Sequence, residues 1–412
     1  MSAVEVRELG GIKRPQARHR WLNAKYREIQ ALFENSPFNA IEDGEGDVAL
    51  VGCGIGYSYV REAQAIIGSR LPVFKLCTLP IPIDRTLQFL KGKKRVVVFE
   101  ELEPVVENLI KELCQEHRID VDILGRSGFY PSDGELTVST VIDALRRAEP
   151  SLENNRPPEV RRLSIDIPVR TRTQCVGCAH RALLYNVKRI ARKRKGIVFG
   201  DIGCHDAGAF KPLELQSTIY CMGSSVPMAT GAFFAGEGRP VFSIIGDSTF
   251  FHLGINGFIN GTYQGATQVV ILCDNGTTAM TGFQPHPGSG VNFYGEISSH
   301  VDLVKLGESV GATVFTVDPY DLDATYETLL EASGTDGLSL VIASKPCFLR
   351  ASREGIKLFE SLDGVRVDQE RCNGCMVCIN DFGCPSLVYD TEVGKVHIDE
   401  ISCVKCGLCI NV

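Results

Sequence analysis

The C-terminal segment holds seven cysteines whose spacing suits iron–sulfur chemistry. Two C-x2-C-x2-C triplets occur there, a Cys-Pro pair follows the first, and the set comprises Cys372, Cys375, Cys378, Cys384, Cys403, Cys406 and Cys409. In proteins that bind two four-iron clusters, each triplet supplies three thiolates to one cluster and lends a fourth cysteine to the other. This spacing predicts a small electron-transfer domain over residues 365–412.

The two triplets depart from the common pattern in ways that affect the ligand count. Five residues separate Cys378 from Cys384, where three are usual, and the chain stops at Val412, one residue before a fourth cysteine of the second triplet is due. We expect a complete [4Fe-4S] cluster on Cys384, Cys403, Cys406 and Cys409. The cluster on Cys372, Cys375 and Cys378 has three thiolates here, so a [3Fe-4S] cluster, a borrowed ligand and a truncated chain all remain open. Zinc, which also accepts C-x2-C pairs, is the alternative to iron.

Two polar turns in the middle of the chain could hold a magnesium ion and a diphosphate. Gly246, Asp247 and Ser248 follow one apolar run, and Asn275 and Thr277 follow the next. The carboxyl ends of neighbouring parallel strands share one edge of a sheet, where such folds bind ligands. Magnesium takes oxygen ligands from one or two protein groups together with substrate phosphates.

We therefore expect Asp247, Asn275 and the backbone near Thr277 to supply the oxygen ligands of Mg²⁺. Gly246 would let a diphosphate approach the backbone, and a helix predicted to begin near Thr249 would offer its positive end. Turn residues with no ligand are the alternative for either turn taken alone.

These turns need parallel sheets to position them. Apolar runs alternate with helical stretches over residues 46–150 and again over 171–360, which predicts two α/β domains. A proline-rich linker over 151–170 would join them, and residues 1–45 resemble a leader or linker with one amphipathic helix near 21–33. The strands predicted in the second domain are KGIVFG, RPVFSIIG, ATQVVILC, TVFTV and SLVIAS.

Composition narrows the class of protein. The chain has 412 residues, 44% hydrophobic and 23% charged, which is ordinary for a globular protein with real cores. The net charge of -7 argues against a nucleic-acid partner, which calls for a basic surface. The N-terminal residues lack a signal-peptide core, and no run reaches the roughly 18 apolar residues of a membrane span. These features favour a cytoplasmic protein without a membrane partner.

Several strings, taken together, resemble a known family. The GDS and DNG turns lie 28 positions apart, as in the diphosphate-magnesium motif of thiamine diphosphate enzymes. With CVGCAHR, GDIGC, CMGSS, DNGTTAMTGFQPHPG and SKPC, the chain from about residue 45 onward resembles the alpha subunit of the indolepyruvate ferredoxin oxidoreductases, within the 2-oxoacid:ferredoxin oxidoreductase superfamily. The family's N-terminal pyrimidine-binding domain has no counterpart in this sequence.

The resemblance implies a fold and an activity. It implies two doubly wound parallel-sheet domains: a transketolase C-terminal-like domain over 46–150 and a thiamine diphosphate-binding domain over 171–360. It also implies a small α+β ferredoxin-like domain with two cluster sites over 365–412. The implied reaction is oxidative decarboxylation of an arylpyruvate to acyl-CoA and CO₂, with two to three iron–sulfur clusters passing electrons to soluble ferredoxin. Implied partners are coenzyme A, the 2-oxo acid, a chain carrying the pyrimidine-binding domain, and a gamma- or beta-type catalytic subunit.

The resemblance also implies roles for residues whose spacing alone is weak. Sister enzymes hold a cluster near thiamine on cysteines at the places of Cys175, Cys178, Cys204 and Cys347, although buried structural cysteines are the alternative. Gly223 and Ser224, in CMGSS, would contact the cofactor. His180, His205, His252 and His286 lie in or beside the matched strings; we expect His252 and His286 to polarise substrate, and Gln284 to line the pocket.

Two rival functions stay open at this point. One is a non-oxidative thiamine decarboxylase, which the predicted clusters disfavour. The other is a non-catalytic iron–sulfur electron-transfer subunit of a larger redox complex. Binding of thiamine diphosphate and magnesium would separate the second from the oxidoreductase.

Overall fold

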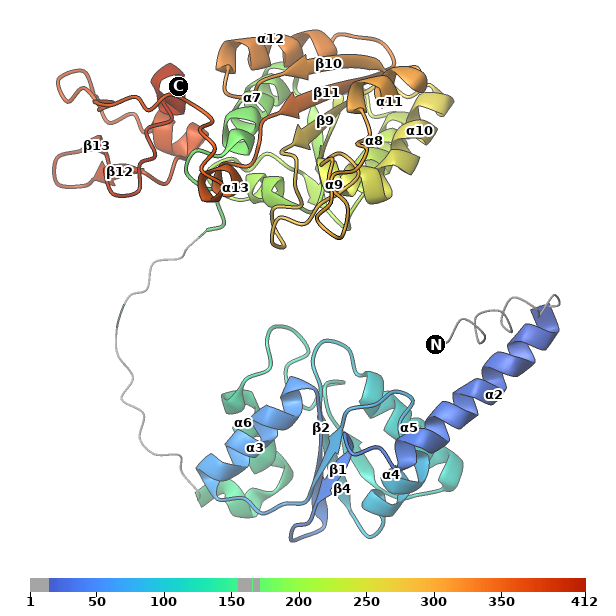
Figure 1. The fold of residues 1–412 in the computed structure, drawn as a ribbon. Coiled ribbons are helices and arrows are strands. Elements are labelled where there is room, and N and C mark those ends of the chain that lie inside the picture. Colours follow the sequence, from blue (N-terminus) through green and yellow to red (C-terminus); the bar gives the residue numbers. More distant parts are fainter. Residues whose placement is uncertain (1–14, 155–164, 166–170) are drawn as a thin grey trace. The chain divides into compact units, whose positions relative to one another are not determined.

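The structure, a computed structural model, describes residues 15–154, 165 and 171–412 (Figure 1). The chain divides into two compact units, Met1–Asp166 and Ile167–Val412, which we describe separately. In the linker predicted over 151–170, residues 155–164 and 166–170 lie outside the described part, as do residues 1–14 of the predicted leader.

The first unit is built on a five-stranded sheet with the strand order β1-β3-β2-β4-β5. Strands β2 to β5 are parallel, and β1 pairs with β3 in the antiparallel sense. The central strand β2 is almost entirely buried, as the apolar run DVALVG predicts for a parallel strand covered on both faces. The strands are β1 (Ala40–Glu42), β2 (Val48–Cys53), β3 (Val73–Leu76), β4 (Arg95–Phe99) and β5 (Asp122–Leu124).

Helices cover both faces of this sheet, with one hydrophobic cluster on each face. Helices α3 and α6 pack side by side on one face, while α4 and α5 lie on the other (Figure 1). None of the side chains of α2 is buried. The helices are α2 (Pro15–Glu34), α3 (Ile55–Ile67), α4 (Ile83–Leu90), α5 (Val105–His117) and α6 (Val138–Ala148), followed by the short turn η1 (Pro150–Asn154).

The second unit is built on a six-stranded parallel sheet with the order β10-β11-β9-β8-β6-β7. Strand β9 lies in the middle, and all its residues except the last are buried. The strands are β6 (Ile197–Gly200), β7 (Thr218–Ile219), β8 (Val241–Gly246), β9 (Gln268–Asp274), β10 (Thr313–Val317) and β11 (Leu338–Ser344).

This sheet is also covered on both faces. Helices α7 and α12 pack together on one face, and α8, α10 and α11 cover the other (Figure 1). The helices are α7 (Ala179–Arg194), α8 (Ser225–Phe234), α9 (Asp247–Thr249), α10 (Ile255–Gln264), α11 (Leu303–Ser309), α12 (Leu322–Ala332) and α13 (Phe348–Arg353), with the short turn η2 (Cys204–Ala209). A π-helical turn, η3 (Phe250–Gly254), joins α9 to α10.

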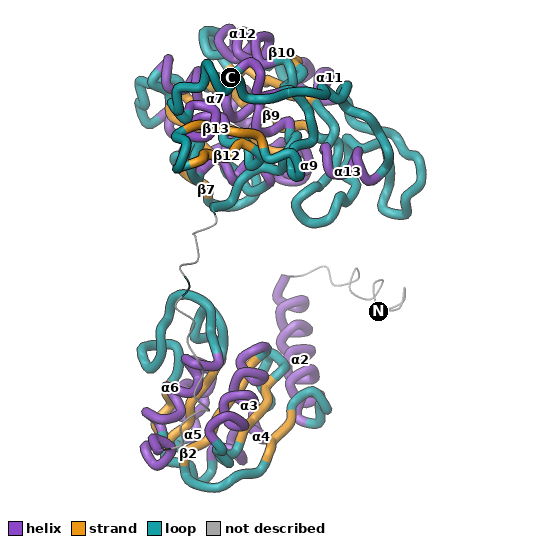
Figure 2. The backbone as a smooth tube through the Cα atoms, turned by 90° about the vertical axis from the view of Figure 1, so that its left-hand side faces the viewer, coloured by secondary structure: helices purple, strands orange, loops and turns teal. Residues whose placement is uncertain are grey.

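The C-terminal tail is mostly loop around a two-stranded antiparallel sheet (Figure 2). It contains η4 (Cys378–Phe382), β12 (Leu387–Asp390), β13 (Lys395–Ile398) and η5 (Leu408–Asn411). Phe382 and Leu408 are buried in a small cluster with Ala182 and Tyr185 of α7. The tail is therefore docked on the second unit.

These features confirm the predicted fold class of two doubly wound α/β domains with a small α+β tail. The five strands expected in the second unit are all present. The short strands β1, β3, β5 and β7 were not predicted. The helix expected near Thr249 begins earlier, at Asp247. None of the helices in the described ranges is long and apolar enough to cross a membrane.

Candidate functional site

The predicted site residues of the second unit gather at one edge of the parallel sheet. Four strands, β6, β8, β9 and β11, end at this edge, and the segments that follow them carry Cys204, Asp247, Asn275 and Cys347. The order changes direction at β6, since β7 lies on one side of it and β8 on the other. Ligands of doubly wound sheets bind at such a point, outside the carboxyl ends of the strands.

Asp247 is held rigidly at the start of α9. Its side chain is buried, with 2% of the residue exposed. Oδ2 accepts hydrogen bonds from the backbone N–H of Asn275 (3.0 Å) and Gly276 (2.8 Å), and Oδ1 accepts one from that of Ser248 (2.7 Å). A carboxylate oxygen can accept more than one hydrogen bond, so Oδ1 keeps a free lone pair.

His286 is the second group that fixes Asp247. Its Nδ1 accepts a hydrogen bond from the N–H of Gly288 at 3.1 Å, so in the neutral ring Nε2 carries the proton. Nε2 then donates to Asp247 Oδ2 at 3.1 Å. Burial alone would raise the pKa of Asp247, yet the hydrogen bond and charge of His286 and the backbone N–H groups hold that pKa below its usual value. Asp247 is thus kept ionised, as a magnesium ligand must be.

The turn after β9 closes over the same place. Asn275 Oδ1 accepts a hydrogen bond from the N–H of Thr277 at 3.1 Å, and Thr278 Oγ1 donates to Ser248 Oγ at 2.8 Å. A cavity of about 100 Å³ lies between the two turns, lined by Gly246, Asp247, Ser248, Asn275 and Thr277 among others. The structure therefore brings together the residues predicted for the diphosphate and magnesium.

The CMGSS turn lies beside this cavity and is anchored from below. The fully buried carboxylate of Asp201 accepts hydrogen bonds from the N–H groups of Gly223 (2.8 Å) and Ser225 (2.9 Å). Gly223 has φ +82°, and a Cβ there would lie 2.7 Å from the Cβ of Leu253. Ser224 bonds back to Cys221, and neither Gly223 nor Ser224 is among the lining residues of the cavity. Their predicted contact with a cofactor stays a prediction.

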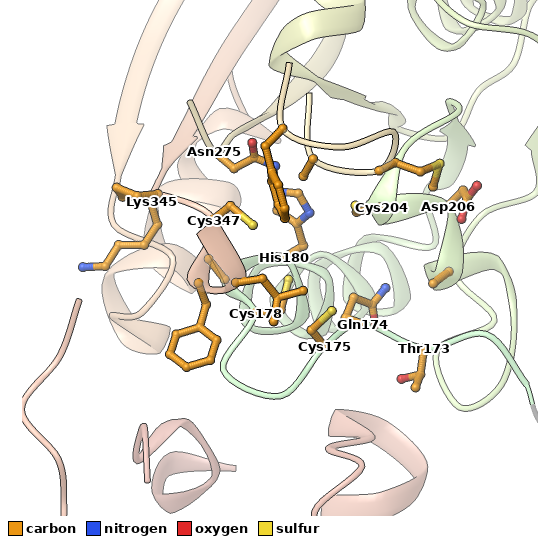
Figure 3. A pocket seen from close by; sticks show the side chains of 18 of the residues that line it. Thr173, Gln174, Cys175, Cys178, His180, Cys204, Asp206, Asn275, Lys345 and Cys347 are labelled. Atoms are coloured by element: carbon orange, nitrogen blue, oxygen red, sulfur yellow. The ribbon is translucent and has the colours of Figure 1, made fainter. Parts of the chain in front are cut away.

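A second cavity, of about 260 Å³, is shared by four cysteines from separate segments. Cys175 and Cys178 precede α7, Cys204 follows β6, and Cys347 follows β11. Figure 3 shows their four sulfur atoms around one space, with His180 in the middle and Asn275 beside it. These are the four residues that the sequence predicted as ligands of an inner cluster.

The inner thiols influence one another electrostatically. Burial, together with the neighbouring thiol of Cys175, raises the pKa of Cys178 to about 12. Burial, together with Cys347 and Cys175, raises the pKa of Cys204 to about 11. These thiols are protonated at neutral pH without a metal, and iron would have to displace the protons, since thiolate is the form that binds metal.

Two histidines separate the cavities. His180 lines both, and its Nε2 lies 3.5 Å from Asn275 Nδ2; His205 lines only the smaller one and is 1% exposed. Burial lowers the pKa of His180, and lowers that of His205 to about 3. Among the described residues, neither ring nitrogen of His205 has a hydrogen-bond partner. Neither histidine was among those we expected to polarise substrate, although His205 directly follows Cys204 and His180 stands two residues after Cys178.

The histidine and glutamine predicted alongside His286 lie elsewhere. His252 is exposed, in the π-helical turn, and lines neither cavity. The Gln284 side chain is exposed and bonds to Thr281, so that only its backbone, paired with Thr278, supports the turn after β9. Five cysteines lack ligand spacing, and the sequence favours a packing role for them; Cys114 and Cys273 are buried and Cys53 is half-buried, whereas Cys77 and Cys221 are exposed.

The tail cysteines form two groups. One apolar cavity is lined by Cys384, Cys403, Cys406 and Cys409, and also by Val176 and Gly177 from the inner cysteine loop. Burial and the thiols of Cys375 and Cys372 raise the pKa of Cys378, which shows that these three lie near one another. Across the described residues, no group of three or more His, Cys, Asp or Glu side chains is arranged to hold a single metal ion.

Residues 201–343 match the family model "Thiamine pyrophosphate enzyme, C-terminal TPP binding domain". The indolepyruvate oxidoreductase subunit IorA of Pyrococcus abyssi is 32% identical over 98% of this chain and 65% of its own length. The IorA of Archaeoglobus fulgidus is 34% identical over 94% of this chain and 62% of its own. Nearly the whole chain is thus similar to part of the indolepyruvate oxidoreductase subunit IorA.

The predicted resemblance to this family is therefore confirmed. The chain spans slightly less than two thirds of the length of these IorA relatives. Among solved structures, a 2-oxoglutarate:ferredoxin oxidoreductase from Magnetococcus marinus is similar at a TM-score of 0.40 and 22% identity, covering 44% of this chain and 66% of that one. A likeness that remote supports no further statement about the site.

Proposed function

We propose that this IorA homologue is a subunit of a thiamine diphosphate-dependent 2-oxoacid:ferredoxin oxidoreductase acting on arylpyruvates such as indolepyruvate. It would convert them, with coenzyme A, to acyl-CoA and CO₂ and pass the electrons to ferredoxin. The observation that carries this proposal is the shared wall of the two cavities. His180, Cys204 and Asn275 line both, so a cofactor held by Asp247 and Asn275 would lie beside the four inner thiols.

The residues present fit a magnesium-bound diphosphate. Asp247 Oδ1 retains a free lone pair, and Asn275 Oδ1 accepts only one hydrogen bond in the structure, from Thr277. Gly246 lines the cavity and has no side chain to obstruct the phosphates. Asp247, Asn275 and the backbone of Thr277 would hold the ion. Thiamine diphosphate, when bound, supplies the carbanion and the electron sink for decarboxylation.

The cysteine arrangement fits iron–sulfur clusters. Four thiols line one cavity beside the cofactor site, and four tail thiols line another. Val176 and Gly177 of the inner loop also line the tail cavity, so that loop lies against both sets of cysteines. We propose that Cys175, Cys178, Cys204 and Cys347 bind the inner cluster, and that Cys384, Cys403, Cys406 and Cys409 bind a [4Fe-4S] cluster in the tail. Cys372, Cys375 and Cys378 would bind a third.

The surface around the smaller cavity has exposed apolar side chains that a partner chain could cover. Met222 and Met280 line it and are about 44% and 43% exposed, and Leu253 beside the CMGSS turn is 52% exposed. Large apolar side chains gathered at the mouth of a site favour a docking surface. We propose that a chain carrying a pyrimidine-binding domain covers this mouth and completes the thiamine site, and that a gamma-type subunit joins the complex.

The decisive experiment is anaerobic viologen reduction by the native complex purified through this chain. Aryl and aliphatic 2-oxo acids would be compared, with and without coenzyme A. We expect reduction that is selective for aryl substrates and dependent on coenzyme A, and that is lost in Asp247→Ala. A complex with intact clusters that reduces viologen with none of these acids and binds no thiamine diphosphate would instead be the electron-transfer subunit.

A further inference from the structure

Arg181, on the first turn of α7, is one of the most deeply buried large side chains of the protein, with 2% of the residue exposed. Its guanidinium group donates to the tail on one side, where Nη1 contacts the carbonyl oxygens of Phe382 and Gly383. On the other side, Nη2 donates to the carbonyl oxygens of Gln174 and Cys175. The acceptors lie immediately before Cys384 of the tail and at the start of the inner Cys175 and Cys178 pair.

The charge of Arg181 has no carboxylate partner. In the described part of the chain, no Asp or Glu pairs with it and its Nε has no hydrogen-bond partner. Burial lowers the pKa of Arg181, while the thiols of Cys384, Cys178 and Cys175 oppose that change. An uncompensated buried charge is strongly destabilising, so a counter-charge is required. The groups that most oppose the effect of burial on Arg181 are the thiols of Cys384, Cys178 and Cys175, which would supply the counter-charge as thiolates once they bind iron.

We propose that Arg181 is a positioning residue that sets the reduction potentials of the inner and tail clusters together and fixes the tail against the inner cysteine loop. The inference rests on the proposed function, because it requires that both sets of cysteines hold clusters. With clusters bound, the inner cysteines and the tail cysteines would hold the donor and the acceptor of one electron, and no bond would be made or broken.

The direction of the effect follows from charge. Reduction makes a cluster more negative, so a fixed cation nearby stabilises the reduced form. Because Arg181 is buried between both sets of thiols, its charge is poorly screened on either side. Removing it should lower the equilibrium constant for one-electron reduction of each cluster by about tenfold, which corresponds to about 59 mV.

Lys188, two turns further along α7, provides a matched control. Its Nζ donates to the carbonyl oxygens of Pro212 (2.9 Å) and Asn380 (3.4 Å) and forms an ion pair with Asp381 at 3.0 Å. It therefore also docks the tail, yet its charge is balanced by a carboxylate. Removing Lys188 should weaken docking without moving either potential.

Redox titration of the full chain, purified anaerobically with its clusters and followed by electron paramagnetic resonance, tests the proposal. Arg181→Met should lower the reduction potentials of both clusters, each by an amount that corresponds to an about tenfold smaller equilibrium constant for reduction. Arg181→Lys should keep potentials close to wild type, because it retains a charge, but should loosen the tail, because an ammonium cannot bridge both sides as a guanidinium does. Lys188→Met should raise the rate of proteolysis between residues 354 and 371 and leave the potentials unchanged.

Each result decides something. Potentials in Arg181→Met that equal those of the wild type, with iron content preserved, would overturn the inference while the proposed function stands. If the Arg181→Met variant does not assemble clusters, the Arg181→Lys variant is used for the test. Reduction potentials lower than wild type in Arg181→Lys, which keeps the positive charge, would overturn the electrostatic role. A wild-type chain that holds no clusters on these cysteines would overturn the inference together with the proposed function.

Discussion

Replacing His286 should weaken magnesium and thiamine diphosphate binding although His286 need not touch either ligand. His286→Leu removes the N–H that donates to Asp247 Oδ2 at 3.1 Å and keeps an apolar group against Phe251, whose ring stacks on the imidazole at 5.6 Å. Asp247 retains its three backbone donors. The predicted defect is therefore loss of orientation rather than loss of the ligand.

The magnitude follows from the hydrogen bond. A hydrogen bond to a charged group contributes about 1.5–3 kcal/mol, which is roughly 10- to 150-fold in affinity. Loss of an outer partner of a metal ligand costs about 10- to 100-fold in metal affinity, which agrees. We expect His286→Leu to weaken binding of Mg²⁺ with thiamine diphosphate within that range, and His286→Gln, which keeps an N–H donor, to weaken it less.

Isothermal titration calorimetry on the complex purified through this chain measures the effect. His252→Leu is the control, because His252 is exposed and lines neither cavity. Circular dichroism would verify that each variant is folded. Affinity in His286→Leu within threefold of wild type, or an equal loss in His252→Leu, would refute the reasoning.

Three further predictions concern the stability of the second unit. The pKa of buried His205 is lowered to about 3, so below about pH 6.5 the unfolded chain binds a proton that the folded chain does not, and this one group should lower the stability by about 1.4 kcal/mol per pH unit. His205→Asn should reduce the measured slope by that amount and leave the part due to His180, whose pKa burial also lowers; hydrogen exchange of β8 and β9 between pH 7 and 5 measures it, and an unchanged slope would contradict the prediction. Gly223→Ala should cost about 1–3 kcal/mol in thermal denaturation, because φ is +82° and the new Cβ meets Leu253, whereas Gly238→Ala, in open space, should be neutral. Phe382 is 1% exposed, and Phe382→Ala should lower the free energy that holds the tail on α7 by about 3–5 kcal/mol, because it leaves a cavity. Proteolysis between residues 354 and 371 should then be faster; cleavage at the wild-type rate would show that other contacts hold the tail.

The predicted elements show where local pattern suffices. The long buried strands β8, β9 and β11 were predicted because parallel strands covered on both faces are continuous apolar runs. Strands β1, β5 and β7 have only 3, 3 and 2 residues, too few for an apolar run to differ from loop. They are strands because a neighbour offers them hydrogen-bonding partners, which is a tertiary effect.

The histidines show where local pattern fails. His252 is nearer in sequence to a predicted magnesium turn than His286 is, yet His252 is exposed and His286 donates to Asp247. The turn that carries His286 folds back under the end of β8, and nothing in the spacing of the residues encodes that return. For the same reason His205 was not among the histidines expected to polarise substrate, although it lines the smaller cavity.

The sequence by itself determined the chemistry available to this protein: thiols in cluster spacing, and an aspartate and an asparagine after successive apolar strands. Only the tertiary structure decided which of them meet. Cys204 and Cys347 lie far apart in the chain and share one cavity because the parallel strands that they follow, β6 and β11, deliver their carboxyl ends to a single edge of the sheet. Arg181 shows the same principle, since its partners in the tail are about 200 residues away. Spacing specifies the type of ligand, whereas burial and sheet register specify its neighbours.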